Sequence, residues 1–410
     1  MIKIGIIREE KTPPDARVPL SPQQCAEVQN RFENVQVVVE PSPVRCFRDD
    51  EYQAAGATLS TNLDDCDVLL GVKEVPISKL LPSKTYLFFS HTIKKQAHNQ
   101  KLLQAILEKN IRLIDYEAIV NERGTRLIAF GFYAGVVGAH NGLWTWGRRT
   151  GQFDLPRMCE SHDYAEVQAA YKNLKLPPLR IVLTGGGRVA SGAVRTLLDM
   201  GIRHVSPDEY LKNEYTEPVF TQLHAHDYVR LKPSAAQQPP SAAFDKQHFY
   251  AHGEAYESAF APFAQRTDIF MNGIFYDPKA PAFFTVADMA APDFRIRVIA
   301  DITCDIAPDS SVPSTIRPSK IADPVYGFDP RTGQETPPFQ PDSIDVMAID
   351  NLPSELPRDA SVFFGKQLIE NVLPQLLKGR QSDDIRRGMI TENGHLTAAF
   401  EYLADYAAGR

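Results

Sequence analysis

Apolar runs of strand length alternate with helical spacings over the first 130 residues of the chain. Residues 35–40 alternate and are rich in valine, which is typical of a strand. Ser21 and Pro22 suit the N-cap and the first position of a helix, and apolar residues within 93–109 recur with helical spacing. The other strands in this region are expected at 2–8, 67–72 and 86–90. Strands separated by helices in this order predict a parallel α/β sheet.

A second set of strands and helices is expected after residue 130. Small residues recur through 131–149, which predicts a tightly packed helix that could run between two domains. The strand 180–184 then starts a new sheet. Further strands are expected at 218–223, 268–273, 296–303 and 345–349, and helices near 160–173, 359–378 and 393–407. We expect a loop at 231–243 and little regular structure in the proline-rich stretch 306–342.

Length and charge narrow the class of protein. A chain of 410 residues is expected to form two domains. Its formal net charge of -7 argues against nucleic acid as the main partner, because phosphate binding needs a basic surface. No apolar run in the sequence is long enough to span a membrane, and residues 1–5 lead into a strand-like run without the layout of a signal peptide. A cytoplasmic location without membrane contact is therefore expected.

The cysteines form no recognisable metal-binding or disulfide pattern. They stand at positions 25, 46, 66, 159 and 304, and none belongs to a CxxC pair. Closely spaced cysteine pairs are the usual sign of a zinc site. We therefore expect neither a metal nor a disulfide framework, and we assign Cys304 no nucleophilic role.

A glycine-rich turn after the strand at 180–184 carries the clearest local motif. Gly185-x-Gly187-x-x-Ala190 fits the dinucleotide fingerprint, in which the last position can be alanine. A tight turn after a strand lets the backbone approach a pyrophosphate, and the following helix N-terminus offers free N–H groups to its charge. The strand before and the helix after this turn favour a dinucleotide site over a glycine-rich turn that merely connects packed elements.

The acidic residue that normally accompanies this fingerprint is missing. In a dinucleotide unit the second strand ends in Asp or Glu, which holds the adenosine ribose. Here the strand at 218–223 is followed by His224, and Asp227 lies further along. No arginine follows the strand directly either. We therefore expect NAD as the cofactor without excluding NADP, and a weakened nucleotide site stays possible.

Several separated motifs give the chain a resemblance to known amino-acid dehydrogenases. The opening segments 5–11 and 16–22 resemble those of alanine dehydrogenases and of lysine-forming saccharopine dehydrogenases. Residues 72–76 (VKEVP) and 89–91 (FSH) resemble the two catalytic segments that both groups share. These groups lie within the alanine dehydrogenase/pyridine nucleotide transhydrogenase superfamily.

Other segments favour the saccharopine dehydrogenases over the alanine dehydrogenases. Residues 129–135 (AFGFYAG) match the saccharopine group closely. The segments 349–353 (IDNLP) and 356–361 (LPRDAS) match it as well. Correspondence is poor over 206–267 and past residue 380. The resemblance nevertheless covers nearly the whole chain, and several motifs in the same order are more specific than any one of them.

The resemblance implies an α/β fold of two Rossmann-like domains with parallel sheets and an active site in the cleft between them. The substrate domain would be discontinuous and comprise residues 1–135 and 351–410. The dinucleotide-binding domain would be inserted between them as residues 136–350. This arrangement would explain why the glycine fingerprint occurs so late in the chain.

Lys73 and His91 are the candidate catalytic residues, because each follows an apolar strand. Ligands bind at the carboxyl ends of strands in α/β sheets, and desolvation lowers the pKa of a lysine. The resemblance implies that Lys73 takes the proton of a secondary amine and that His91 handles protons during imine hydrolysis. The residues alone also allow Lys73 to pair with Glu74 at the surface and His91 to cap the helix at 93–109.

The resemblance also implies a set of substrate-binding residues. Arg17 and Arg126 are candidates for binding carboxylates, since a guanidinium can form two parallel hydrogen bonds with a carboxylate. Outside the family context, either arginine would be read as a surface residue. Glu74 and Glu117 are expected to tune the pKa of Lys73. The remaining candidates are Gln96, Phe130, Thr303, Cys304 and Asp305.

The cofactor would contact residues of four separate segments. Gly187 and Arg188 would meet the pyrophosphate, Phe275 corresponds to an adenosine-side position, and residues 349–352 would lie near the nicotinamide. The candidate cofactor-binding residues are Gly185, Gly187, Arg188, Val189, Phe275, Asp301, Ile302, Ile349, Asp350, Asn351 and Leu352.

The function implied is that of an NAD-dependent oxidoreductase acting on a CH–NH bond. Saccharopine, NAD and water would give lysine, 2-oxoglutarate and NADH, so the partners would be small molecules. One alternative is an alanine dehydrogenase or another amino-acid dehydrogenase. A second, motivated by the missing ribose acid, is a nucleotide-binding protein without turnover. The sequence does not determine the physiological direction or the oligomeric state.

Overall fold

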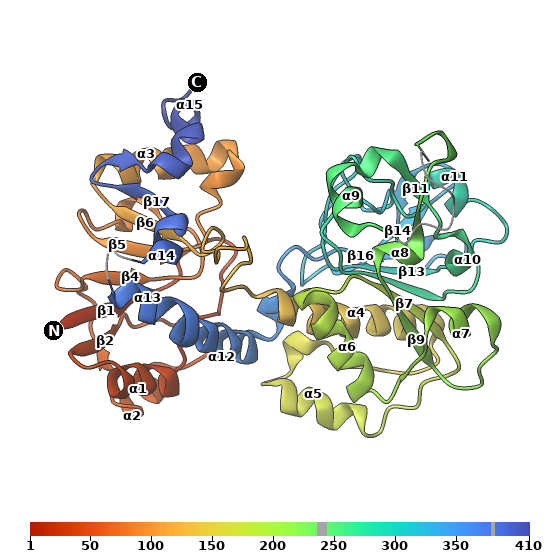
Figure 1. Ribbon diagram of the computed structural model, residues 1–410. Helices are drawn as coiled ribbons and strands as arrows, with labels where there is room; N and C mark the ends of the chain where they lie inside the picture. The colour runs from red at the N-terminus through yellow and green to blue at the C-terminus, as the bar shows by residue number, and fades with distance from the viewer. Residues whose placement is uncertain (236–243, 379–381) are drawn as a thin grey trace. The chain divides into compact units, whose positions relative to one another are not determined.

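The computed structural model describes residues 1–235, 244–378 and 382–410 and divides the chain into two compact units (Figure 1). Unit 1 comprises Met1–Phe130 and Pro357–Arg410, and unit 2 comprises Gly131–Leu356. These borders lie five and six residues from the positions expected at 135/136 and 350/351. The reason is local packing, because the first turns of helix α4 (Gly131–Thr150) pack on other parts of unit 2 and Leu352 and Leu356 belong to its core.

Unit 1 is built on a sheet that, in the described residues, has eight strands in the order β18-β17-β6-β5-β4-β1-β2-β3. Six strands, β6 to β3 in that order, pair in parallel, whereas β17 and β18 from the end of the chain pair antiparallel at one edge. The strands are β1 (Ile2–Ile6), β2 (Val35–Val39), β3 (Thr58–Leu59), β4 (Val68–Leu70), β5 (Thr85–Phe88), β6 (Arg112–Asp115), β17 (Met389–Glu392) and β18 (His395–Leu396).

Helices from both ends of the chain cover this sheet (Figure 1). Helix α1 begins as the sequence predicts, because Ser21 and Gln24 form a capping box and Pro22 occupies the first turn. The α-helices are α1 (Pro22–Arg31), α2 (Asp49–Ala54), α3 (Gln100–Glu108), α12 (Pro357–Gln367), α13 (Leu373–Leu377), α14 (Asp383–Gly388) and α15 (Ala404–Ala407). The other helical segments are the 3-10 turns Ile77–Lys79, Thr92–Lys94, Ala97–Asn99 and Ala398–Leu403 and the π-helical turn Leu368–Val372.

Unit 2 contains a second sheet, with eight strands within the described ranges in the order β15-β14-β16-β13-β12-β7-β9-β8. The strands from β16 to β8 are parallel, and β14 and β15 extend the sheet antiparallel. They are β7 (Arg180–Thr184), β8 (Arg203–His204), β9 (Val219–Leu223), β12 (Ile269–Asn272), β13 (Val298–Asp301), β14 (Tyr326–Asp329), β15 (Gln334–Thr336) and β16 (Ile344–Met347). Strands β10 (Val229–Leu231) and β11 (Tyr256–Ser258) form a separate antiparallel ribbon.

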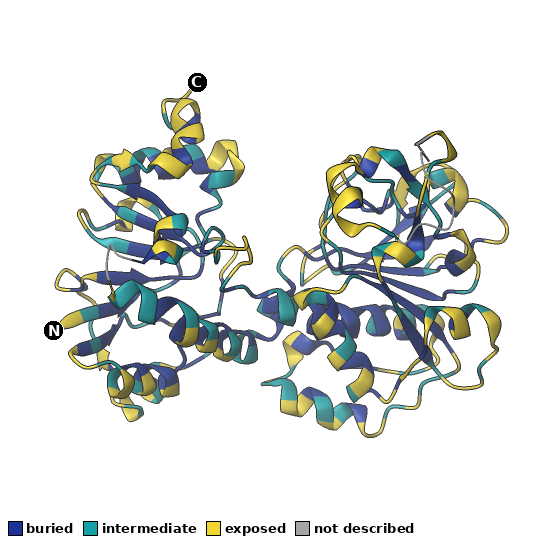
Figure 2. Ribbon diagram, viewed as in Figure 1, coloured by how far each residue is buried: buried dark blue, intermediate teal, exposed yellow. Residues whose placement is uncertain are grey.

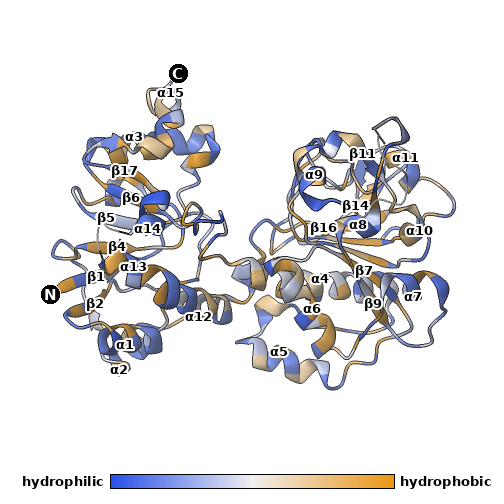
Figure 3. Cartoon of the chain, in the orientation of Figure 1, coloured by the Kyte–Doolittle hydropathy of each residue, from blue (hydrophilic) through white to orange (hydrophobic). Residues whose placement is uncertain are grey.

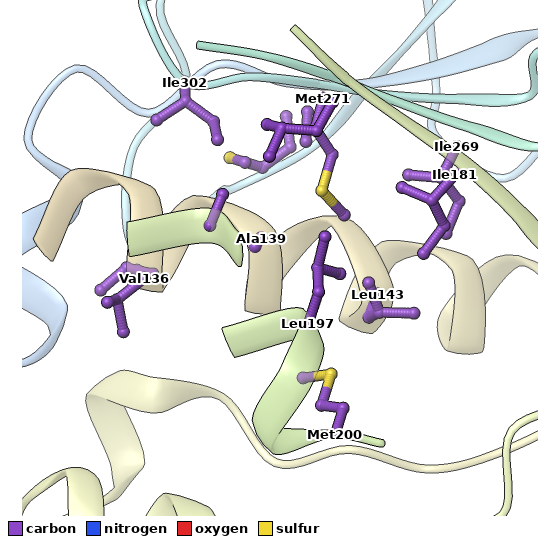
Figure 4. Packing of buried hydrophobic residues seen from close by; sticks show 14 of the residues in the cluster. Val136, Ala139, Leu143, Ile181, Leu197, Met200, Ile269, Met271 and Ile302 are labelled. Carbon is purple, nitrogen blue, oxygen red and sulfur yellow. The ribbon is translucent and has the colours of Figure 1, made fainter. Parts of the chain in front are cut away.

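Helices α4 and α6 (Arg188–Asp199) pack in close backbone contact on this sheet. A Cβ atom at Gly135 would lie 1.8 Å from the Val189 carbonyl oxygen, and one at Gly192 would lie 1.9 Å from that of Phe132. The run of small residues therefore marks a tight helix contact, as predicted, and α4 belongs wholly to unit 2. Figure 4 shows residues of α4, β7, α6 and β12 meeting in the core of this unit.

The remaining helices of unit 2 are short. They are α5 (Tyr164–Tyr171), α7 (Pro207–Lys212), α8 (Ala225–Tyr228), α9 (Lys246–Ala251), α10 (Ala261–Ala264) and α11 (Val286–Met289). The 3-10 turns are Met158–Glu160, Pro233–Ala235, Gly253–Ala255 and Leu352–Glu355. Within each unit the sheet strands are largely buried and apolar, and the outer helix faces are exposed and polar (Figures 2 and 3). The two-domain α/β fold predicted from the sequence is confirmed.

Several predicted elements differ in detail. The segment 93–109 is two 3-10 turns followed by α3, because Lys95 adopts positive φ and the backbone of Gln96 is extended, which interrupts a continuous helix. The stretch 306–342 contains β14 and β15, and 393–407 contains a strand and a 3-10 turn. Of the expected loop 231–243, residues 236–243 lie outside the described residues. None of the helices in the described ranges is long and apolar enough to cross a membrane.

Candidate active site and nucleotide pocket

The candidate catalytic residues of unit 1 follow the carboxyl ends of four adjacent parallel strands, β1, β4, β5 and β6. Segment 72–74 follows β4, His91 follows β5 and Glu117 follows β6, while Glu9 to Arg17 follow β1. Carboxyl ends of neighbouring parallel strands meet at one sheet edge, which is where α/β proteins bind ligands. Strand order therefore gathers residues that are far apart in the sequence.

Lys73 is a partly buried cation in this group. Burial and, to a smaller extent, the neighbouring Arg17 lower its pKa to about 8, whereas Asp15 opposes the shift. A lysine with a pKa close to neutrality exists partly as the free amine, which can accept a proton. The Lys73 side chain therefore has the charge environment of a general base.

Glu74 links His91 and Lys11. Its Oε1 lies 2.5 Å from Nδ1 of His91, and its Oε2 accepts a hydrogen bond from Nζ of Lys11 at 2.8 Å. Burial alone would raise the pKa of Glu74, but the hydrogen bonds from His91 and Lys11 lower it to about 2. Glu74 is therefore a carboxylate that orients the His91 ring.

The contact between His91 and Glu74 argues against two alternative roles, that of His91 as a helix cap and that of Lys73 as a surface partner of Glu74. His91 precedes the turn Thr92–Lys94, but in the part of the chain that the structure describes its side chain makes no capping hydrogen bond. Its ring contacts Glu74 instead. Both oxygens of Glu74 are engaged by His91 and Lys11, so a simple surface pair of Lys73 with Glu74 does not describe this segment.

Arg17 lies in a buried ion pair with Asp15. Its Nε and Nη2 donate to the two carboxylate oxygens at 3.0 and 2.6 Å. Its guanidinium stands 4.3 Å from the ring centre of Phe130, which stacks on Phe364. Burial raises and Arg17 lowers the pKa of Asp15, with a net lowering. Arg17 is thus buried rather than a surface residue, and its charge is largely balanced by Asp15.

Glu117 and Arg126 also meet. Nη2 of Arg126 donates to Oε1 of Glu117 at 2.8 Å, and Nζ of Lys94 lies 3.5 Å from the same oxygen. Oε2 of Glu117 is buried without a hydrogen-bond partner among the described residues. Gln96 is exposed on the 3-10 segment after His91. Unit 1 therefore contains a mixed group of acidic and basic side chains around the ends of β4, β5 and β6.

A cavity of about 840 Å³ opens beside the glycine-rich turn of unit 2. Gly185, Gly186 and Gly187 line it, together with His224, Lys246, Phe275 and other residues. Gly185 has a φ of +106°, and a Cβ there would lie 2.5 Å from the Gly273 carbonyl oxygen. A Cβ on Gly187 would meet no atom within 4 Å, so the backbone is open to a ligand. This cradle fits the pyrophosphate of a dinucleotide.

Most of the predicted cofactor residues of unit 2 are not among the residues that line this cavity. Arg188 and Val189 begin α6, and Asp301 ends β13. Ile302, Ile349 and Leu352 are buried, whereas Asp350 is exposed and Asn351 is partly exposed. Of the predicted set, Gly185, Gly187 and Phe275 line the cavity.

Asp301 forms a buried polar network with the predicted substrate residue Thr303. Its carboxylate accepts hydrogen bonds from the hydroxyls of Thr303 and Thr315 and from Nδ2 of Asn272. Burial raises its pKa, and these hydrogen bonds oppose the rise. Cys304 adopts a φ of +55° and its thiol donates to the Ala348 carbonyl oxygen. Burial raises the pKa of this thiol to about 12, so the thiol keeps its proton at neutral pH.

The cavity also involves residues that the sequence reasoning missed. His224, His226 and Lys246 line it, and Asp277 is the acidic residue among the described lining residues. The His224 ring packs on the turn, because a Cβ at Gly186 would lie 2.9 Å from its Cε1. Asp227 is turned to the backbone, where it accepts the His224 N–H at 2.7 Å. The histidines that follow the strand at 218–223 were the sequence feature from which this part of the cavity could have been predicted.

The fold and these two sites define a two-domain α/β protein with a cavity beside the glycine-rich turn of its second unit. Residues 5–137 match the family model described as alanine dehydrogenase/PNT, N-terminal domain. This match agrees with the resemblance that the motifs of the chain indicate.

Curated relatives match nearly the whole chain. It is 29% identical to the alpha-aminoadipic semialdehyde synthase of Arabidopsis thaliana over 98% of its length, but it spans only 41% of that relative. It spans 47% of the corresponding mitochondrial protein of Rattus norvegicus. It is 27% identical to the NAD(+), L-lysine-forming saccharopine dehydrogenase of Emericella nidulans, with 92% of each chain covered. The resemblance to saccharopine dehydrogenases is thus confirmed.

Solved structures share the fold. An L-alanine dehydrogenase superposes with a TM-score of 0.66 at 15% identity, covering 99% of this chain and 100% of the other. A transhydrogenase from Sinorhizobium meliloti gives a TM-score of 0.57 at 15% identity, covering 96% and 100%. At this identity the likeness concerns architecture alone.

Proposed function

We propose that the protein is an NAD-dependent dehydrogenase acting on the CH–NH bond of an amino acid, with saccharopine as substrate. The observation that carries the proposal is Lys73, with its lowered pKa, next to Glu74 and its partner His91 at one sheet edge. The glycine cradle of unit 2 supplies a fitting dinucleotide site. The names of the fungal relatives support NAD and the lysine-forming reaction. We propose a cytoplasmic location.

Lys73 begins the reaction by accepting the proton of the substrate's secondary amine. Gly185, Gly187 and Arg188 would hold the pyrophosphate of the dinucleotide, and a bound nicotinamide would supply the hydride acceptor for the adjacent carbon, which would leave an imine. His91, oriented by Glu74, then removes a proton from the water that adds to the imine carbon. Lys73 returns its proton to the nitrogen, which gives a neutral carbinolamine. His91 then passes the proton of the water to the nitrogen while Lys73 accepts the hydroxyl proton, so that the C–N bond breaks and lysine and 2-oxoglutarate leave.

The substrate carries three carboxylates, and the proposal assigns cationic groups to them. Arg126 is exposed and adjoins Glu117. Arg17, although paired with Asp15, keeps its guanidinium against Phe130 and close enough to Lys73 to lower its pKa. We propose that Gln96, Thr303 and Asp305 contribute polar contacts to the same substrate. The cofactor roles of Arg188, Asp301 and residues 349–352 are likewise part of this proposal.

An alanine dehydrogenase is the second candidate function. The family model over residues 5–137 and the alanine dehydrogenase fold favour it. It would join ammonia and pyruvate rather than lysine and 2-oxoglutarate, and it would need fewer carboxylate contacts. Binding of a nucleotide without turnover is a third possibility, since no carboxylate follows β9 directly.

A parallel absorbance assay distinguishes the three. NADH loss is followed with lysine and 2-oxoglutarate, with ammonia and pyruvate, and with each component omitted, and every reaction is repeated with NADPH. Turnover that requires both lysine and 2-oxoglutarate supports the proposal. Turnover with ammonia and pyruvate favours the alanine reaction. If no mixture reacts while NADH still binds in a fluorescence titration, the protein binds the nucleotide without this chemistry.

A further inference from the structure

A buried carboxylate holds the backbone of the candidate catalytic lysine. The Val72 N–H donates to Oε1 of Glu9 at 2.6 Å, and the Lys73 N–H donates to Oε2 at 2.9 Å. Glu9 is buried, with 9% of its surface exposed. One carboxylate therefore binds two successive N–H groups just beyond the end of β4. No role described above uses this residue.

The sheet brings the two segments together. Strands β1 and β4 are parallel neighbours, with Ile6 opposite Leu70. The chain leaves both strands at the same edge, so Glu9 and Lys73 meet although they are 64 positions apart. Gly71 permits the approach, because a Cβ there would lie 2.7 Å from Cδ1 of Ile7 and 3.4 Å from Oε1 of Glu9.

We call the two hydrogen bonds from the Val72 and Lys73 N–H groups to Glu9 the clamp. It affects the positions of two functional side chains, those of Lys73 and Glu74. Residues 72 and 73 are fixed by Glu9, and the next residue, Glu74, binds both His91 and Lys11. Fixing this short segment sets where the Lys73 ammonium leaves the backbone and keeps Glu74 within reach of His91. A shift of about 1 Å in such a group can lower a rate about 10²-fold.

We propose that Glu9 is a positioning residue for proton transfer, holding Lys73 and Glu74 in place through the backbone of residues 72–73. The proposal rests on the proposed function, because it assigns Glu9 to the same reaction. Glu9 does not touch the reacting atoms and acts through Lys73. Its carboxylate is also the reason why the segment after β4 keeps its shape without regular secondary structure.

Charged groups on the neighbouring elements determine when the clamp is complete. Burial, with a smaller contribution from Asp15, raises the pKa of Glu9 to about 7, and the Val72 and Lys73 N–H groups and Arg17 oppose this rise. Tyr116, which follows β6, is a further ionisable group near Glu9. A protonated carboxyl places an O–H where an acceptor is needed. The clamp is therefore complete above the pKa of Glu9 and weaker below it.

The test compares Glu9→Gln with Glu40→Gln. Glu40 follows β2 and also accepts a backbone N–H, that of Arg8 at 2.8 Å, but it is not hydrogen-bonded to residues 72–74. We expect E9Q to lower kcat about 10²-fold with a much smaller change in KM. E40Q should keep wild-type kinetics. Equal kcat values and pH profiles for E9Q, E40Q and the wild type would overturn the proposal.

A second readout needs no turnover. The reactivity of the Lys73 amine towards acetic anhydride is measured against pH by peptide mass spectrometry. If Glu9 positions Lys73, its loss lets the ammonium relax towards solvent, and the Lys73 pKa rises from about 8 towards its ordinary 10.5. If the loss of the Glu9 charge left the Lys73 side chain in place, the Lys73 pKa would stay unchanged or fall. That result would contradict the proposal. This readout also separates a failure of the clamp from a failure of the proposed reaction.

A shorter carboxylate keeps the test decisive if E9Q does not fold. Glu9→Asp retains the charge but is shorter by one methylene group. Folding of each variant is checked by circular dichroism and by NADH titration, which reports on the pocket of unit 2. E9D should also lower kcat and raise the Lys73 pKa, and wild-type values for both would overturn the positioning role.

Discussion

Nδ1 of His91 lies 2.5 Å from Oε1 of Glu74, although the two residues follow different strands of the unit 1 sheet. The Glu74 pKa of about 2 means that this oxygen carries negative charge at neutral pH. A carboxylate on one ring nitrogen fixes the orientation of the imidazole and leaves the other nitrogen to exchange protons with a substrate. His91 and Glu74 thus form an oriented pair next to Lys73.

Glu74→Gln should impair proton transfer without affecting nucleotide binding. The amide cannot supply the negative charge that orients His91 and pairs with Lys11. We expect kcat to fall by about 10- to 10²-fold, within the range for loss of acid–base assistance. Steady-state kinetics and an NADH titration check this. Glu10→Gln is the matched control, since Glu10 pairs with Arg8 and Lys79. If E74Q were as active as E10Q, the oriented pair would have no catalytic part.

The rate should rise with pH as Lys73 loses its proton. The pKa of about 8 predicts that kcat/KM increases up to about pH 8 and then levels off. A profile is measured from pH 6 to 10 with saturating NAD. A rate that is flat across the region near pH 8 would contradict a base with this pKa.

Lys73 should also make stability depend on pH. Its pKa is lower in the folded chain, about 8 against an ordinary 10.5. Between these values the unfolded chain binds more protons, so the free energy of unfolding rises with pH through this window. Below it, the buried ammonium costs at most about 3 kcal/mol. Lys73→Met should therefore raise the Tm at pH 7 while abolishing turnover, as thermal melts and assays would reveal. An unchanged or lower Tm would mean that Lys73 is not desolvated.

His224→Asp should shift cofactor preference towards NADH. The ring of His224 stands directly after β9, where a carboxylate would accept hydrogen bonds from the adenosine ribose and repel a 2′-phosphate. We expect the ratio of the Kd for NADPH to that for NADH to increase by about tenfold or more, which corresponds to about 1.4 kcal/mol. Fluorescence titrations measure both constants. His204→Asp, on the exposed strand β8, is the control, and equal ratios for the two variants would remove His224 from the ribose site.

The contact between α4 and α6 should tolerate no side chain at Gly135. Its Cβ would lie 1.8 Å from the Val189 carbonyl oxygen, so the helices would have to separate. Gly135→Ala should lower stability by about 1–3 kcal/mol or more, with a lower Tm and weaker NADH binding. At Gly131, on the same helix, the nearest atoms to a Cβ are 3.6 Å away, so Gly131→Ala should be nearly neutral. Similar melts for the two variants would contradict this packing.

The sequence allowed part of the site to be predicted because Lys73 and His91 each follow an apolar run that forms a buried strand. It did not reveal Glu9 or Lys11, whose contacts with residues 72–74 depend on β1 lying beside β4. Strand order is a long-range property that local periodicity does not contain.

Local backbone conformation and the pairing of buried charges could not be predicted from the sequence either. The segment 93–109 has helical spacing, but the positive φ of Lys95 and the extended backbone of Gln96 prevent one helix. Arg17 could be recognised as a cation, whereas its pairing with the nearby Asp15 in a buried site could not. The His224 contact with Gly186 likewise depends on the parallel register of β7 and β9.

The most direct test of the central claim is the initial rate of NADH oxidation with lysine and 2-oxoglutarate, measured for the wild type and for Lys73→Met. We predict a rate in the wild type that requires both substrates and a loss of at least about 10²-fold in the variant, with NADH binding retained. A variant that turns over at the wild-type rate, or a wild type that oxidises NADH only with ammonia and pyruvate, would contradict it.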